Sequence, residues 1–189
     1  MEKPRITVAL HNTEAAEKIK YALQRSGYSV GEICTSGNET LRKLRAAAPD
    51  ILLINFDMPD MTGLEVATIV GDENLCSVIL LITNAQRAFC VDMVEDYDIT
   101  LHLKPISRTA LLSTIDVVLQ SRRRMSKLSR ELFDLKRGME NRKKIERAKG
   151  ILMKRKSISE GEAYRRIQKM SMDSRVSMRD IAEKIIELA

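Results

Sequence analysis

The sequence of 189 residues has little cysteine and no long apolar run, and both absences restrict what the protein can be. Its longest uninterrupted apolar runs, residues 51–54 and 78–82, are far shorter than the roughly 20 residues of a membrane-spanning helix. The run at residues 6–10 is too short for the apolar core of a secretion signal. The three scattered cysteines lack metal or disulfide spacing, so we expect each to be a small buried hydrophobe. We therefore expect a soluble cytoplasmic protein with no membrane segment, metal or cofactor.

The charge of the chain is unevenly distributed, although 44% hydrophobic and 31% charged residues are ordinary for a globular protein. Residues 1–120 contain 11 Lys and Arg against 16 Asp and Glu, a net charge of −5. Residues 121–189 contain 21 against 10, a net charge of +11. This asymmetry indicates that only the C-terminal part meets a polyanion such as nucleic acid. A long solvated helix that happens to be basic would give the same count.

Short apolar runs alternate with segments of helical spacing as far as residue 120. The spacing predicts strands at residues 5–10, 28–34, 51–55, 77–83 and 99–103. It predicts helices at residues 15–24, 39–47, 63–70 and 85–94 and from residue 107 onward. Five strands that alternate with helices predict an α/β fold, in which helices cover both faces of a parallel sheet. Functional groups are then expected at the carboxyl ends of the strands.

The residues at those strand ends resemble the receiver domain of bacterial response regulators, over roughly residues 4–120. The resemblance is carried by Met58-Pro59 and Gly63 after the third strand, Thr83 at the end of the fourth, and Lys104-Pro105 after the fifth. It implies a flavodoxin-like fold with a five-stranded parallel sheet and a phosphoacceptor pocket at the sheet edge.

The pocket that this resemblance implies is degenerate. Asn55 occupies the position of the phosphoacceptor aspartate, and His11 and Asn12 replace the acidic pair that holds a divalent metal. Phosphoryl transfer needs a carboxylate nucleophile and a cation that neutralises the phosphoryl oxygens. We therefore expect no phosphorylation, no catalytic residue and no enzyme activity here. Lys104 and Thr83 are expected only to hydrogen-bond Asn55, and a regulatory protein or ligand is expected to act on the receiver instead.

Three further residues bear on the pocket that this resemblance implies. Asp57 is the alternative phosphoacceptor, but it would lack a cage of metal ligands. Leu101 replaces the aromatic switch residue that receivers carry three positions before the lysine. His102 could in principle join His11 in a metal or pH site, although a lone histidine near a strand end is more often a satisfied rim residue.

No proline occurs between residues 107 and 155, which permits one long helix. Apolar residues recur in it at alternating spacings of three and four, the a/d pattern of a coiled coil. These seam residues are Met125, Leu128, Leu132, Leu135 and Met139. The pattern predicts a parallel coiled-coil homodimer, with residues 121–142 as the linker helix. Packing of the same stripe against the receiver would produce the same pattern.

Three amphipathic segments complete the chain and predict a small three-helix bundle. Ser159 with Glu162 and Ser177 with Asp180 form capping pairs at two helix starts. We expect a basic outer surface on this bundle. It comprises Lys143, Lys144, Arg147, Lys149, Lys154, Arg155, Lys156, Arg165, Arg166, Lys169, Arg175 and Arg179.

Residues 141–188 resemble the ANTAR domain, the RNA-binding module of bacterial transcription antitermination regulators. The resemblance is carried by residues 146–153, 158–172 and 177–182. It implies binding to paired stem-loops in a nascent leader transcript, which prevents a terminator hairpin from forming. The domains expected from the whole chain are a pseudo-receiver at 1–120, the coiled-coil linker at 121–142 and the RNA-binding domain at 143–189.

The candidate RNA contacts combine one aromatic residue with basic ones. They are Lys149, Tyr164, Arg165, Arg166, Lys169, Arg175 and Arg179. Tyr164 is expected either to stack on an unpaired base or to be a half-buried core residue. A DNA-binding response regulator is one alternative, although a recognition helix from Ser177 would bring only Arg179 and Lys184. A pseudo-receiver adaptor controlled by a protein partner is the other.

Overall fold

The computed structural model describes residues 3–188, apart from the side chains of residues 92, 93, 95 and 96. Residues 1, 2 and 189, which begin and end the expected domains, lie outside the described residues. The chain divides into two compact units, the first ending at Arg124 and the second beginning at Met125. None of the described helices combines the length and apolar character needed to cross a membrane.

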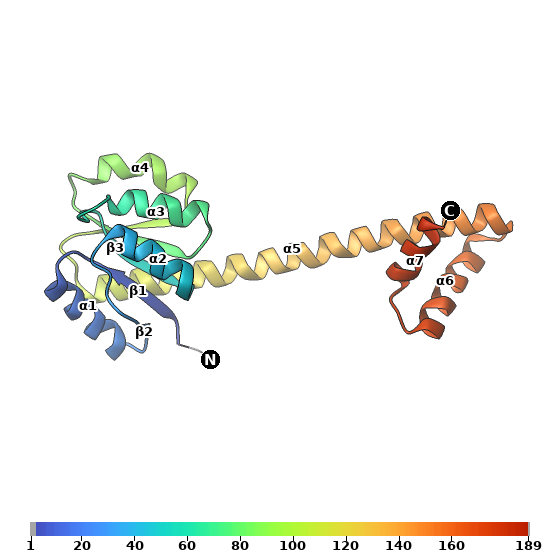
Figure 1. Ribbon diagram of the computed structural model, residues 1–189, viewed down its shortest axis with the longest axis horizontal. Coiled ribbons are helices and arrows are strands. Elements are labelled where there is room, and N and C mark those ends of the chain that lie inside the picture. The colour runs from blue at the N-terminus through green and yellow to red at the C-terminus, as the bar shows by residue number, and fades with distance from the viewer. Residues whose placement is uncertain (1–2, 189) are drawn as a thin grey trace. The chain divides into compact units, whose positions relative to one another are not determined.

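The first unit contains a parallel sheet of five strands in the order β2-β1-β3-β4-β5 (Figure 1). The strands are β1 Arg5–Ala9, β2 Ser29–Val30, β3 Ile51–Asn55, β4 Ser77–Ile82 and β5 Ile99–Leu103. This is the flavodoxin-like sheet that the sequence predicts. Because β2 and β3 pair with opposite sides of β1, the order reverses there. Loops at such a reversal form the usual binding crevice of an open α/β sheet.

The second strand is shorter than the sequence indicates. Only Ser29 and Val30 form a ladder with β1, and a single further bridge joins Cys34 to Ala9. As an edge strand, β2 has one neighbour to hold it, and Gly31 and Glu32 between the two contacts are exposed. Periodicity in sequence does not distinguish such an edge from a central strand.

Helices cover both faces of the sheet, as expected from its parallel strands. They are α1 Thr13–Arg25, α2 Gly37–Ala47, α3 Gly63–Asp72, α4 Arg87–Asp96 and the first part of α5 Arg108–Lys156. Leu52 and Ile54 of β3 pack in a core with α2, α3 and α4, whereas Ile51 and Leu53 pack in a core with α1 and α5. The three cysteines, Cys34, Cys76 and Cys90, are free thiols buried in this unit, as expected.

The second unit is a three-helix bundle formed by the end of α5, α6 Glu160–Ser174 and α7 Met178–Glu187. Ser159 and Ser177 cap α6 and α7, and both capping boxes with Glu162 and Asp180 are present as predicted. The apolar faces meet in one core. It contains Ala148, Leu152, Ala163, Ile167, Ile181, Ala182 and Ile185.

Candidate nucleic-acid interface and degenerate receiver pocket

At the end of β3, Asn55, which the sequence resemblance places at the phosphoacceptor position, has both ends of its amide engaged. The Lys104 ammonium donates to Asn55 Oδ1, as expected from the sequence. Asn55 Nδ2 in turn donates to the backbone carbonyl of Asp57 at 2.9 Å. The following loop closes tightly on β3, because a Cβ at Gly63 would lie 2.0 Å from the carbonyl oxygen of Asn55. A side-chain amide in this position is a very poor nucleophile, and here it serves as a structural link between β3 and β5.

Gln86, which precedes α4, connects Thr83 to Asp57. It is not among the pocket residues that the sequence predicts. Its Oε1 accepts from the backbone N–H of Thr83 at 2.9 Å. Its Nε2 donates to both carboxylate oxygens of Asp57, at 2.9 and 3.1 Å. Asp57, the alternative phosphoacceptor, is therefore tied to the loop between β4 and α4. The expected hydrogen bond from Thr83 to Asn55 stays a prediction, and no motif marks Gln86 in the sequence.

The loop after β1 does not fit a divalent metal. Asn12 is the N-cap of α1, and its Oδ1 accepts from the backbone N–H of Ala15 at 3.0 Å. His11 beside it is exposed. With Asn55 across the crevice, these positions supply no carboxylate, the ligand that a hard cation such as Mg²⁺ requires. Within residues 3–188, leaving aside the undescribed side chains, no group of three or more His, Cys, Asp and Glu residues could hold a metal.

Two further titratable groups near the sheet, His102 and Asp60, each contact a structural partner. His102 is buried, and its Nδ1 lies 3.1 Å from Thr114 Oγ1 of α5, while burial lowers the pKa of the imidazole. Its Nε2 is buried without a hydrogen-bond partner in the described part of the chain. Asp60 accepts from the backbone N–H groups of Asn38 and Gly37, which hold the pKa of its carboxyl below the usual range.

Lys149 corrects the sequence prediction of a uniformly exposed basic surface. It is only 7% exposed, and its Nζ lies 2.8 Å from Glu146 and 2.7 Å from Glu160. These two carboxylates raise the pKa of the ammonium. Because Glu146 lies on α5 and Glu160 begins α6, Lys149 holds the two helices together. The spacing in sequence places Lys149 near Glu146, but only the packing of α6 covers it.

Arg179 is also engaged within the bundle. Its Nε donates to Glu183 Oε1 at 3.1 Å, one turn further along α7. The same oxygen accepts from Lys144 of α5, so Glu183 joins α5 to α7. Both cations hold the pKa of Glu183 below its usual range. The sequence prediction did not include Glu183, although its spacing of four from Arg179 is typical of a helical ion pair.

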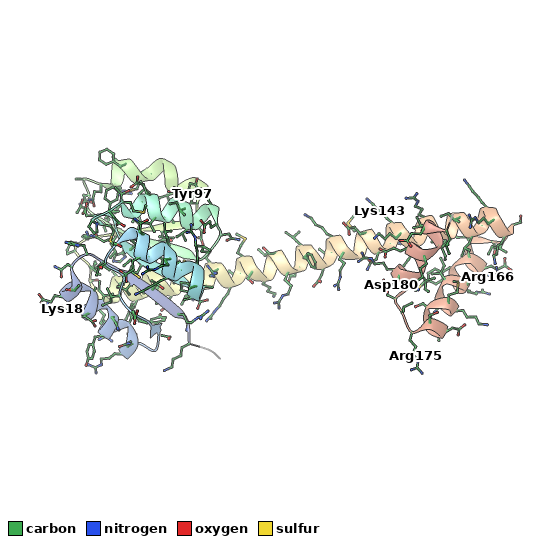
Figure 2. All side chains as sticks on the ribbon, viewed as in Figure 1. Lys18, Tyr97, Lys143, Arg166, Arg175 and Asp180 are labelled. Atoms are coloured by element: carbon green, nitrogen blue, oxygen red, sulfur yellow. The ribbon has the colours of Figure 1, made fainter. Side chains whose placement is uncertain are left out.

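The outer surface of α6 carries most of the other candidate RNA contacts. Tyr164 is 44% exposed and lies outside the bundle core, whereas Ile167 of the same helix is fully buried. Arg165, Arg166 and Lys169 are exposed. Arg175, at the end of α6, is exposed in a left-handed backbone conformation with φ of 53° (Figure 2). We name Tyr164, Arg165, Arg166 and Lys169 the α6 surface.

The seam residues of α5 are exposed as well. Each side chain is between 54% and 66% exposed, and none belongs to a hydrophobic core of the described residues. They are Met125, Leu128, Leu132, Leu135 and Met139. Every side chain between residues 123 and 140 is exposed, so this part of α5 presents an apolar stripe to solvent.

Comparison with known proteins finds one domain in each of the two parts of the chain. The chain matches the response regulator receiver domain over residues 6–116 and the ANTAR domain over residues 134–186. It is similar to the transcriptional regulatory protein PdtaR of Mycobacterium tuberculosis, with 28% identity over 166 residues, which cover 87% of this chain and 80% of that protein. It is also similar to the nitrate regulatory protein of Klebsiella oxytoca, with 35% identity over 72 residues. These 72 residues cover 38% of this chain and 18% of that protein.

Solved structures show the same fold in the first unit. The CheY-like response regulator receiver domain protein of Methanospirillum hungatei JF-1 superposes with a TM-score of 0.58 and 22% identity. The match covers 66% of this chain and 99% of that one. Both matched domains are regulatory modules rather than enzymes. The chain therefore belongs to the response regulator receiver family and carries an ANTAR domain after its receiver domain.

Proposed function

We propose that this protein binds paired stem-loops in nascent leader transcripts and prevents a terminator hairpin from forming there. The observation that carries the proposal is the exposed, basic α6 surface, which lies within the segment that matches the ANTAR domain. We assign the receiver to residues 1–120, the linker to 121–142 and RNA binding to 143–189. Its place of action is the bacterial cytoplasm, where leader transcripts are synthesised.

The chemistry of the α6 surface suits a hairpin loop. Loops display unstacked bases, which proteins recognise by stacking on aromatic rings and by hydrogen bonds to base edges. Tyr164 offers such a ring, since nearly half of its surface is exposed. Arg165 and Lys169 lie one helical turn apart beside it, where two cations can contact successive phosphates.

The proposed assembly is a homodimer joined through the seam of α5. A stripe of five large apolar side chains on an otherwise polar helix is favourable in water only when a partner covers it. A second copy of the same helix in register places Leu128 and Leu135 against their own copies. Two linked RNA-binding domains then match two stem-loops, because the first binding event raises the effective concentration for the second.

The proposed input to the receiver is a protein or ligand rather than a phosphoryl group. Asn55 offers no carboxylate, and the amide is engaged by Lys104 and the carbonyl of Asp57. Gln86 ties Asp57 to the loop before α4. A partner that binds at this edge of the sheet would act on a pocket already closed by hydrogen bonds.

The test of the proposed function compares RNA with duplex DNA. Full-length protein is titrated with a fluorescent pool of stem-loop RNAs whose loops are randomised, and separately with duplex DNA. The double variant R165Q/K169Q is expected to bind RNA about tenfold more weakly and to have a smaller dependence of affinity on salt. The control K127Q/R130Q removes the same charge outside the a and d positions of the seam and is expected to bind like the wild type.

Two outcomes contradict the proposal. Tighter binding to duplex DNA than to any stem-loop would identify a DNA-binding response regulator. Absence of binding to either nucleic acid would favour the pseudo-receiver adaptor.

A further inference from the structure

A groove of about 530 Å³ lies between the C-terminal part of α5 and the last turns of α7. This volume is within the range of small-ligand sites in proteins. The groove is lined by Lys143, Lys144, Arg147, Glu183, Ile186 and Glu187. Lys143 is labelled on α5 in Figure 2, and Arg166 of the α6 surface is labelled on a different helix of the same bundle.

The cations of this groove differ in their availability. Lys144 is paired with Glu183, which also accepts from Arg179 of α7. Lys143 and Arg147 are exposed, and neither forms an ion pair within the described residues. They are four residues apart on α5, so both side chains project from the same face of the helix. One rim of the groove therefore presents two uncommitted cations to an anion.

The floor and the opposite rim have different chemistry. Ile186 packs at the edge of the bundle core and leaves apolar surface in the groove. Glu187, at the end of α7, is exposed and lines the groove with an acceptor carboxylate from α7, whereas the two cations come from α5. A ligand suited to this groove combines an anionic group, a flat apolar body and a hydrogen-bond donor. An acidic peptide suits it poorly, because Glu183 and Glu187 would repel its carboxylates.

We propose that the groove holds one unpaired nucleotide of the bound RNA, with its phosphate between Lys143 and Arg147 and its base against Ile186. The exocyclic amino group of an adenine, cytosine or guanine donates to the Glu187 carboxylate, whereas uracil has no such donor. This inference rests on the proposed RNA-binding function. It adds a second contact surface on α5 and α7, separate from the α6 surface.

The experiment uses full-length protein and stem-loop RNAs with randomised loops, selected with the wild type and measured by fluorescence anisotropy. The double variant K143Q/R147Q is expected to lose about tenfold or more in affinity and about one to two charges of salt slope. The charge-matched control K127Q/R130Q is expected to stay within about twofold of the wild type, since its residues lie outside both the groove and the α6 surface. Circular dichroism melting of each variant separates loss of binding from loss of folding.

The single variant E187Q tests how the base is recognised. Wild-type selections are expected to disfavour uracil at one loop position. E187Q is expected to weaken that preference while keeping most of its affinity, because its amide oxygen still accepts from an amino group but its amide nitrogen can also donate to uracil O4. Because Glu187 is exposed, this substitution leaves the core intact.

The outcomes distinguish this inference from the function on which it rests. Wild-type binding that K143Q/R147Q and E187Q leave unchanged overturns the nucleotide site but retains RNA binding. Failure of the wild type to bind any stem-loop overturns the proposed function itself. Capture of a labelled oligoglutamate that K143Q/R147Q abolishes, with RNA binding unaffected, would assign the groove to an acidic peptide instead.

Discussion

Replacing Tyr164 with alanine is expected to weaken RNA binding without unfolding the bundle. The side chain is 44% exposed and lies outside the hydrophobic core, so its ring is available to an unpaired base. Loss of one base stack costs about 1–3 kcal/mol, which corresponds to roughly 5- to 150-fold in Kd. Tyr164→Phe keeps the ring and is expected to bind close to the wild type.

Ile167, three residues after Tyr164 on α6, provides the comparison for the effect of Tyr164→Ala on the stability of the bundle. Ile167 is fully buried in the bundle core, and its replacement by alanine is expected to cost about 2–5 kcal/mol. In a unit of this size the unfolding temperature would fall by roughly 10 °C or more. Tyr164→Ala is expected to shift it far less, because more of its side chain is already in water. Thermal melting monitored by circular dichroism measures both variants.

The assay is a titration of fluorescent stem-loop RNA with Tyr164→Ala, Tyr164→Phe and wild-type protein at several salt concentrations. A base stack predicts that Tyr164→Ala lowers affinity while the salt slope stays the same, since no phosphate contact is lost. The reasoning is refuted if Tyr164→Ala binds as tightly as the wild type. It is also refuted if the loss of affinity is matched by a loss of folded protein.

Three further predictions concern the seam, the pocket and the sheet. The double variant L128K/L135K is expected to sediment as a monomer and bind paired stem-loops more weakly than the wild type, and a dimeric variant would disprove the seam. Acetyl phosphate with Mg²⁺ is expected to leave the wild type unmodified by intact-mass spectrometry, and Asn55→Asp alone to react poorly, because the loop after β1 supplies no carboxylate; an adduct on Asp57 would contradict this. Burial lowers the folded pKa of His102, so the unfolded chain binds the proton more readily and stability is lost as pH falls through about 6.5. His102→Asn is expected to flatten the pH dependence of the unfolding midpoint in that window, and an unchanged profile would show that other groups cause it.

The receiver pocket shows how a degenerate site can stay ordered. Lys104 and Asn55 link β5 to β3, and Gln86 links the loop before α4 to Asp57. In this arrangement the polar groups at the edge of the sheet satisfy one another. Asn55, Gln86 and Lys104 are half-buried, and their hydrogen bonds give partners to polar atoms that would be costly to leave unpaired away from water.

Local and periodic features of this protein could be predicted from the sequence. The apolar runs of β3 and β4 are continuous because both faces of those strands are buried, and the spacing of α6 and α7 follows the helical repeat. Ser159 and Ser177 predict the starts of α6 and α7, because a capping box depends on residues only three apart. The asymmetry of charge likewise marks the basic C-terminal unit without any knowledge of the fold.

Contacts between elements distant in sequence were decided only by the tertiary structure. The sequence predicts an exposed cation at Lys149, but the packing of α6 places Glu160 against it. Arg179 and Lys144 share Glu183 only because α5 and α7 pack together. Gln86 joins Asp57 only because β3 and β4 are neighbours in the sheet. Periodicity and capping act within a few residues, whereas burial and ion pairing depend on which surfaces meet when the helices and strands pack.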